Sequence, residues 1–163
     1  MQRNDLARTL ETFKELECLE LALAAFYGLC GDPAASESDF WAALAREERG
    51  HADAIRRMAA ILAERPDRFE PSRMFHLTAI HTFRAYVESL AERLRTGDIA
   101  RLDQHHLLSL ARDLEQSVLE SKWGEIVKTT DAEFQASLRG IIAETRTHTS
   151  KIAARLAATP QRA

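Results

Sequence analysis

The sequence is poor in cysteine, glycine and proline, and each shortage excludes a class of protein. The two cysteines among 163 residues, Cys18 and Cys30, form no C-x-x-C pair, which excludes a rubredoxin-like or zinc-knuckle module. Two cysteines are also too few for a disulfide framework, which favours a reducing cytoplasm as the location. Four prolines and six glycines leave long stretches without a residue that interrupts a helix.

Long apolar runs and a strong charge of one sign are missing as well. The longest apolar run, Leu21 to Tyr27, is far shorter than the roughly 20 residues that span a bilayer. The first residues, MQRNDLARTLETFK, contain neither the apolar core nor the cleavage site of an export signal, so we expect no export. The net charge of −3 gives no reason to expect nucleic acid or an anionic membrane as a partner.

Helix-forming residues dominate what is present, and glycine and proline gather at the expected breaks. The pattern predicts helices over about residues 5–29, 39–64, 73–95, 103–128 and 131–158. Because no stretch alternates like a strand, we expect an all-α fold with a single domain over residues 1–163. Short loops make the first two and the last two helices antiparallel pairs. The long crossover between the pairs, which contains segment 73–95, is the connectivity of a ferritin-like four-helix bundle.

Each of the four bundle helices carries a glutamate or a histidine inside its apolar stripe. Residues three, four and seven apart share a helix face. Ionised carboxylates in a bundle core are costly unless a cation compensates them. Several of them without a cation on the same stripe indicate a shared divalent metal. The stripe residues are Glu20, Glu48, His51, Glu115 and His148.

An internal repeat gives this set its weight. The pair Glu48 and His51 alone means little, because composition predicts about 0.6 Glu-x-x-His pairs in such a chain. Both halves, however, read helix, glutamate in the stripe, short loop, helix, histidine in the stripe, with Glu20 and His51 in one half and Glu115 and His148 in the other. This order predicts a pseudo-twofold metal site between the halves. We expect no ligand role for the remaining histidines: His76, His81, His105 and His106.

The segments LECLELALAAFY, AREERGHADAI, LARDLEQSVLES and IIAETRTHTSKI resemble the rubrerythrin branch of the ferritin-like superfamily. The resemblance implies a carboxylate-bridged di-iron centre. It also implies a role for each stripe residue, with Glu20 and Glu115 as terminal carboxylates, Glu48 as a bridge, and His51 and His148 as nitrogen ligands. Tyr27 falls where the family often has a tyrosine beside the ligands.

The chain departs from this family at three points. Thr145 stands where the family has its second bridging glutamate, and Val118 stands where peroxidase-type members carry a further glutamate. The rubredoxin module that delivers electrons is missing. Glu144 lies one residue from the bridging position and points about 100° away on an ideal helix, and whether a local distortion makes it an extra ligand stays open. The hydroxyl of Thr145 can instead hold a water beside the metal.

The resemblance implies a protein that handles iron with O₂ or peroxide, as a peroxidase or a ferroxidase with an external electron donor. One or two iron ions are expected, with zinc or manganese as alternatives. The other interpretation is a non-catalytic bundle, structural or partner-binding, with a vestigial or mononuclear site, which Thr145 and Val118 favour. The apolar stripe of segment 73–95 predicts a homodimer.

Overall fold

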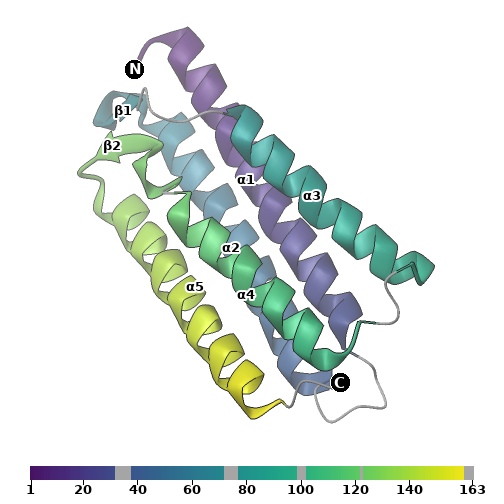
Figure 1. The fold of residues 1–163 in the computed structure, drawn as a ribbon. Helices are drawn as coiled ribbons and strands as arrows, with labels where there is room; N and C mark the ends of the chain where they lie inside the picture. Colours follow the sequence, from purple (N-terminus) through teal and green to yellow (C-terminus); the bar gives the residue numbers. More distant parts are fainter. Residues whose placement is uncertain (32–37, 72–76, 99–101, 122, 160–163) are drawn as a thin grey trace.

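The computed structural model describes residues 1–31, 38–71, 77–98, 102–121 and 123–159, and this part of the chain is almost entirely helical (Figure 1). The all-α prediction is therefore confirmed. The helices are α1 (Arg3–Cys30), α2 (Ser38–Glu64), α3 (Leu77–Thr96), α4 (Gln104–Glu120) and α5 (Ala132–Ala158). No helix in the described ranges is both long enough and apolar enough to cross a membrane.

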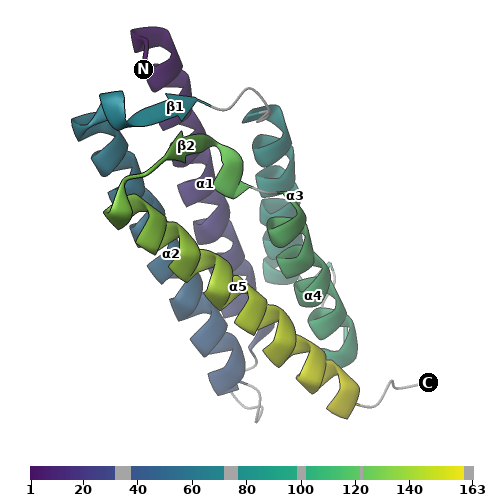
Figure 2. The same cartoon turned by 90° about the vertical axis from the view of Figure 1, so that its left-hand side faces the viewer.

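Successive helices run in opposite directions along the molecule, as the colour gradient shows (Figure 1). α1 packs mainly against α2 and α3, whereas α5 packs mainly against α4 and α2. α3 flanks α1 on the outside, so the connection from α2 to α4 traverses the length of the molecule (Figures 1 and 2). As a consequence α2 and α4 run in the same direction, and each has an antiparallel partner that is its neighbour in sequence.

The apolar stripes of the helices form one core, with aromatic clusters towards both ends. Near the start of α5, the ring of Phe134 packs edge-on against Phe13 and Phe69, with centroids 5.8 and 5.1 Å away. Where α1 ends and α2 begins, the rings of Tyr27 and Trp41 stack with centroids 6.0 Å apart. The glutamates and histidines of the stripes lie between these two clusters along the helices.

The fourth helix ends earlier than the sequence predicts. α4 stops at Glu120, and the 3-10 turn η2 (Trp123–Glu125) and strand β2 (Val127–Thr129) replace the helix that was expected to reach about residue 128. β2 pairs antiparallel with β1 (Phe69–Pro71), which follows the 3-10 turn η1 (Pro66–Arg68). The prediction of no strand was wrong here, because three-residue strands are too short to produce a recognisable alternation.

The segment that was expected in the crossover packs within the chain. Ile80, Val87 and Leu90 of α3 are buried, and Nε of Arg84 lies 2.9 Å from Oε2 of Glu15 on α1. Tyr86, which belonged to the predicted apolar stripe, is 50 % exposed. Since α3 packs against α1 and buries these apolar residues within the chain, the homodimer stays a prediction without support from this helix.

Candidate metal centre

The five predicted ligands come together in the core. Each is at most 2 % exposed, although all are polar. Their ligand atoms form two groups of three within the described residues, and the atoms of each group lie within 4.8 Å of one another. The first group is Glu20, Glu48 and His51, and the second is Glu48, Glu115 and His148. Glu48 belongs to both groups and therefore lies between two places that could each hold a metal ion.

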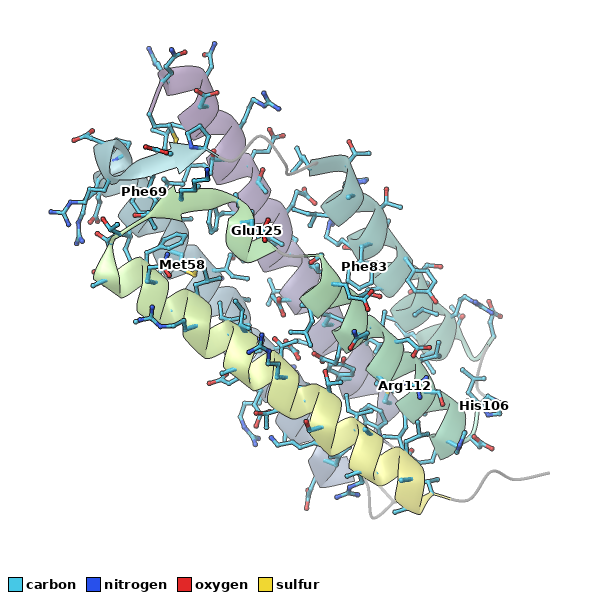
Figure 3. All side chains as sticks on the ribbon, turned by 60° about the vertical axis from the view of Figure 1, so that its left-hand side comes forward. Met58, Phe69, Phe83, His106, Arg112 and Glu125 are labelled. Atoms are coloured by element: carbon cyan, nitrogen blue, oxygen red, sulfur yellow. The ribbon has the colours of Figure 1, made fainter. Side chains whose placement is uncertain are left out.

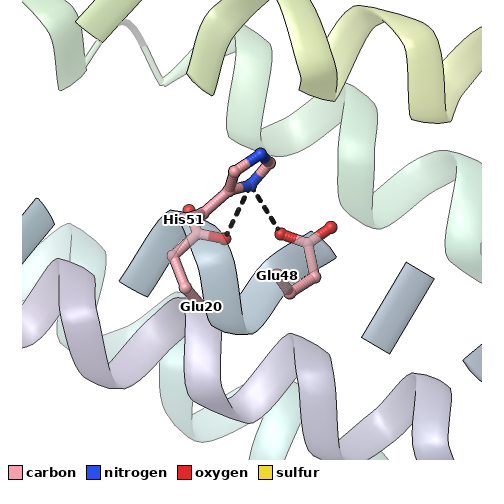
Figure 4. A group of neighbouring side chains, drawn as sticks. All are labelled: Glu20, Glu48 and His51. Carbon is pink, nitrogen blue, oxygen red and sulfur yellow. Dashed lines mark hydrogen bonds and ion pairs between the residues drawn. The ribbon is translucent and has the colours of Figure 1, made fainter. Parts of the chain in front are cut away.

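The first group joins α1 and α2 (Figure 4). Nδ1 of His51 lies 2.9 Å from Oε2 of Glu48 and 3.7 Å from Oε2 of Glu20. Glu48 and His51 are three residues apart on α2 and so share a face, while Glu20 approaches from α1. Two carboxylates and one ring nitrogen thus converge on one point, a donor set that suits iron, manganese and zinc.

The second group joins α2, α4 and α5. Nδ1 of His148 lies 2.8 Å from Oε1 of Glu48 and 3.5 Å from Oε1 of Glu115. Glu48 therefore turns one oxygen towards each histidine. The rings of His51 and His148 stack with centroids 5.4 Å apart and an angle of 25° between their planes. This geometry gives Glu48 the position of a bridge between the two groups.

The outer nitrogen of each histidine contacts a glutamate of the facing helix. Nε2 of His51 lies 3.0 Å from Oε2 of Glu144 on α5, and Nε2 of His148 lies 2.8 Å from Oε2 of Glu47 on α2. A carboxylate at this nitrogen fixes the orientation of the ring and leaves Nδ1 for a metal. Glu144, with a side chain 62 % exposed, thus lies at the nitrogen of His51 opposite the two groups and not among their ligand atoms.

Glu47 was missed by reasoning from the sequence, although a signal was present. Glu47 precedes His51 by four residues, as Glu144 precedes His148. Residues 47–51 read Glu-Glu-Arg-Gly-His, and residues 144–148 read Glu-Thr-Arg-Thr-His. This shared E-x-R-x-H pattern could have indicated that each outer glutamate serves the histidine of the other helix.

Tyr27 lies beside the second group, where the resemblance implied a tyrosine. Its hydroxyl donates a hydrogen bond of 2.7 Å to Oε1 of Glu115. Burial raises the pKa of Tyr27 well above its ordinary value, and the negative charges of Glu115 and Glu48 add to this effect. The phenol therefore stays protonated and remains a donor to Glu115.

Thr145 and Val118, where the resemblance implied carboxylates, contribute no ligand atom to either group. Thr145 is buried, and its hydroxyl donates a hydrogen bond of 2.9 Å to the carbonyl oxygen of Ile141, one turn earlier on α5. Val118 is a buried apolar residue one turn after Glu115 on α4. The second group consequently depends on Glu48 for one of its two carboxylates.

Protons on the two histidines balance the buried carboxylates. Burial opposes the charged form of each ring, but contacts with Glu20 and Glu48 raise the pKa of His51 to about 11, and contacts with Glu115 and Glu48 raise the pKa of His148 to about 10. Burial would also raise the pKa of Glu48, but its close contacts with His148 and His51 outweigh this effect and hold that pKa well below its usual range.

The pKa values of Glu20 and Glu115 are shifted upwards instead. Burial, followed by the charge of Glu48, raises the pKa of Glu115 to about 7. Burial likewise raises the pKa of Glu20 well above its ordinary value. A metal that binds here must displace protons from these groups and from the histidines, so its affinity depends on pH.

Three ligand atoms have no hydrogen-bond partner among the described residues: Oε1 of Glu20, Oε1 of Glu48 and Nδ1 of His148. The last two lie 2.8 Å apart as an ion pair, but their angles are not those of a hydrogen bond. Leaving a buried polar atom unsatisfied costs about 1–3 kcal/mol. The unsatisfied atoms and the chemistry of the donors both fit a divalent metal ion.

His81, His105 and His106 belong to neither group. His81 and His106 are exposed, and His105 is half-buried. His106 lies at the periphery, at the start of α4 (Figure 3), where its backbone N–H donates to the carboxylate of Asp103, the N-cap of the helix. His76 lies outside the described residues.

Comparison with known proteins adds no relative to these observations. No protein-family model matches the chain, and no curated protein and no solved structure matches it.

Proposed function

We propose that the protein is a ferritin-like metalloprotein that binds one or two iron ions in this centre and acts as an oxidoreductase towards O₂ or peroxide. The observation that carries the proposal is Glu48, whose two oxygens belong to two buried groups of carboxylate and imidazole donors. The ferritin-like arrangement is supported by the antiparallel pairs α1–α2 and α4–α5, joined by a crossover that contains α3. Manganese or zinc suits the same donors.

Each residue of the centre has a definable part in this function. Glu20, Glu48 and His51 would hold one ion, and Glu48, Glu115 and His148 the other. Bound iron supplies redox chemistry and open coordination positions for the oxidant. Since three carboxylates and two imidazoles serve two positions, the protein leaves coordination positions open at both. Electrons for a peroxidase reaction would come from an external donor.

The surrounding residues keep these ligands in place. The carboxylates of Glu144 and Glu47 hold the histidine rings with Nδ1 directed inwards. The hydroxyl of Tyr27 orients Glu115. The apolar side chains around the centre exclude water, which strengthens the attraction between the carboxylates and a cation.

A second candidate function is a non-catalytic bundle, and the charge compensation within the centre favours it. The carboxylates raise the pKa of His51 to about 11 and that of His148 to about 10, so both rings are cations at neutral pH in the metal-free protein. As permanent cations they would tie the carboxylates of α1, α2 and α4 together without any metal. In that case the ion pairs serve the stability of the bundle.

Metal analysis separates the two candidates. Protein purified without chelator, and protein reconstituted with Fe(II) under anaerobic conditions, should contain about one or two ions per chain. Finding no metal in either preparation would contradict the metalloprotein and support the structural bundle. Absorption spectra recorded after mixing the Fe(II)-loaded protein with O₂ and with H₂O₂ separately then distinguish a ferroxidase from a peroxidase.

A further inference from the structure

A cavity lies between α4 and α5, and Val118 and Thr145 are part of its lining. Its volume is about 370 Å³, within the range of sites for small molecules. Its aliphatic lining comes from both helices: Val118, Leu119, Leu138, Ile141 and Ile142.

Two lining residues connect this cavity to the candidate metal centre. Val118 lies one turn after Glu115 on α4, and Thr145 lies one turn before His148 on α5. Both lining residues are buried. Side chains three residues apart on a helix are about 5–6 Å from each other. The cavity therefore begins one helical turn from two ligands of the second group.

The turn η2 closes a third side of the cavity through Gly124. A Cβ atom added to Gly124 would lie 3.5 Å from side-chain atoms of Leu138 and of Ile142, which is ordinary van der Waals contact. Glycine thus leaves space that a methyl group would occupy without a clash. Gly124→Ala is therefore a mild way to narrow the cavity.

The polar groups of the cavity define the charge of its ligand. The Thr145 hydroxyl donates its proton to the backbone of its own helix, so it offers only an acceptor. At the rim, Arg146 and Glu125 are exposed, and neither forms an ion pair within the described residues. Because one cation and one anion border the opening, it has no net charge. An uncharged molecule enters such an aliphatic cavity without the cost of desolvating a charge.

We propose that this cavity binds a small uncharged aliphatic molecule beside the metal centre. The position beside a metal rests on the proposed function, whereas binding itself requires only the aliphatic lining. Thr145 and Val118 place two uncharged side chains between the cavity and the ligands of the second group. The cavity then defines the class of substrate that reaches the centre.

Calorimetric titration of the metal-free protein tests the ligand with three probes of equal chain length: 1-octanol, octanoate and octylammonium. We expect 1-octanol to bind saturably and the two ions to bind about tenfold more weakly or worse. Ile142→Trp should weaken binding strongly because the indole occupies part of the cavity and covers its aliphatic lining. Leu156→Trp, a change of equal kind at a partly buried residue of the same helix outside the cavity, should leave the affinity unchanged. Gly124→Ala should give an intermediate loss.

Several results would overturn the proposal. The first is that 1-octanol does not bind, and the second is that 1-octanol binds the Ile142→Trp variant as tightly as the unchanged protein. The third is that octanoate or octylammonium binds more tightly than 1-octanol. Self-association that Ile142→Trp abolishes, without 1-octanol binding, would assign the cavity to a second copy of the chain. For the position beside the metal, the NMR signals of 1-octanol should broaden in Co²⁺-loaded protein, and unchanged signals would overturn it. A protein that takes up no metal but binds 1-octanol supports the cavity ligand and contradicts only the proposed function.

Discussion

The α1–α2 half of the candidate centre contains two buried carboxylates, Glu20 and Glu48, whereas the α4–α5 half contains only Glu115. Thr145 stands three residues before His148, as Glu48 stands three residues before His51. Its hydroxyl donates a hydrogen bond to the backbone. The second group completes its donor set with Oε1 of Glu48. The α4–α5 half therefore depends on a residue of the other half, while the α1–α2 half does not.

The two halves agree in how they orient their histidines. Glu144 contacts the outer nitrogen of His51, and Glu47 contacts that of His148, at nearly equal distances. The asymmetry is thus confined to the inner carboxylates and to the cavity beside Thr145. Variants that change one half at a time therefore test where this asymmetry comes from.

Glu48→Gln is expected to have the largest effect, because it removes the shared carboxylate from both halves at once. Metal content measured by mass spectrometry should fall from about one or two ions per chain to a trace. Glu115→Gln is the matched control, since it removes a carboxylate from the α4–α5 half alone and should leave the first ion bound. Equal losses in the two variants would contradict the idea that Glu48 is shared.

Raising the pH from 6 to 8 should strengthen metal binding in both halves. His51 and His148, with pKa values of about 11 and about 10, are protonated throughout this range and must each release a proton to the solvent. Each released proton strengthens binding about tenfold per pH unit. Competition titrations with a chelator at several pH values measure this slope, and a flat profile would show that the metal does not replace these protons.

The metal-free protein should show the opposite trend in stability. The raised pKa values of the two histidines contribute stability that is fully present below their ordinary pKa of 6.5 and is lost as the pH rises through about 10 and 11. Urea denaturation in the presence of EDTA should therefore give a falling free energy of unfolding between pH 7 and pH 11. His51→Gln should reduce this dependence.

Thr145→Glu should make the halves more alike. A second inner carboxylate adds a negative charge beside the second metal position, which we expect to tighten binding of the second ion on the order of tenfold or more. Thr145→Gln, of the same size but without the charge, is the control. If both variants bind the second ion equally, the deficit of the α4–α5 half does not come from charge.

Glu47→Gln and Glu144→Gln should each weaken metal binding by about tenfold, the low end of what the loss of such a partner costs. We expect the larger loss for Glu47, whose side chain is 35 % exposed and also contacts Lys151, than for Glu144, which is 62 % exposed. Separate dissociation constants for the two ions provide the test. Glu47→Gln should affect mainly the ion bound by His148, and loss at the other ion would contradict the reciprocal contacts.

Residue spacing along single helices was enough to predict much of this structure. The apolar stripes indicated the helices and singled out Glu20, Glu48, Glu115 and the two buried histidines, because a buried polar residue stands out within its own helix. The early end of α4 and the pairing of Val127–Thr129 with Phe69–Pro71 were missed, since a short strand is defined by its partner. Glu47 was missed because it lies beside the stripe and acts on a ring from another helix.

The reciprocal contacts of Glu47 and Glu144 also have a consequence for how α2 and α5 assemble. Each glutamate lies four residues before the histidine of its own helix and contacts the histidine of the other. A slip of α5 along α2 by one turn, about 5.4 Å, would break both contacts together and separate the two rings. The same pair of bonds that orients the ligands therefore fixes the longitudinal register of the two helices.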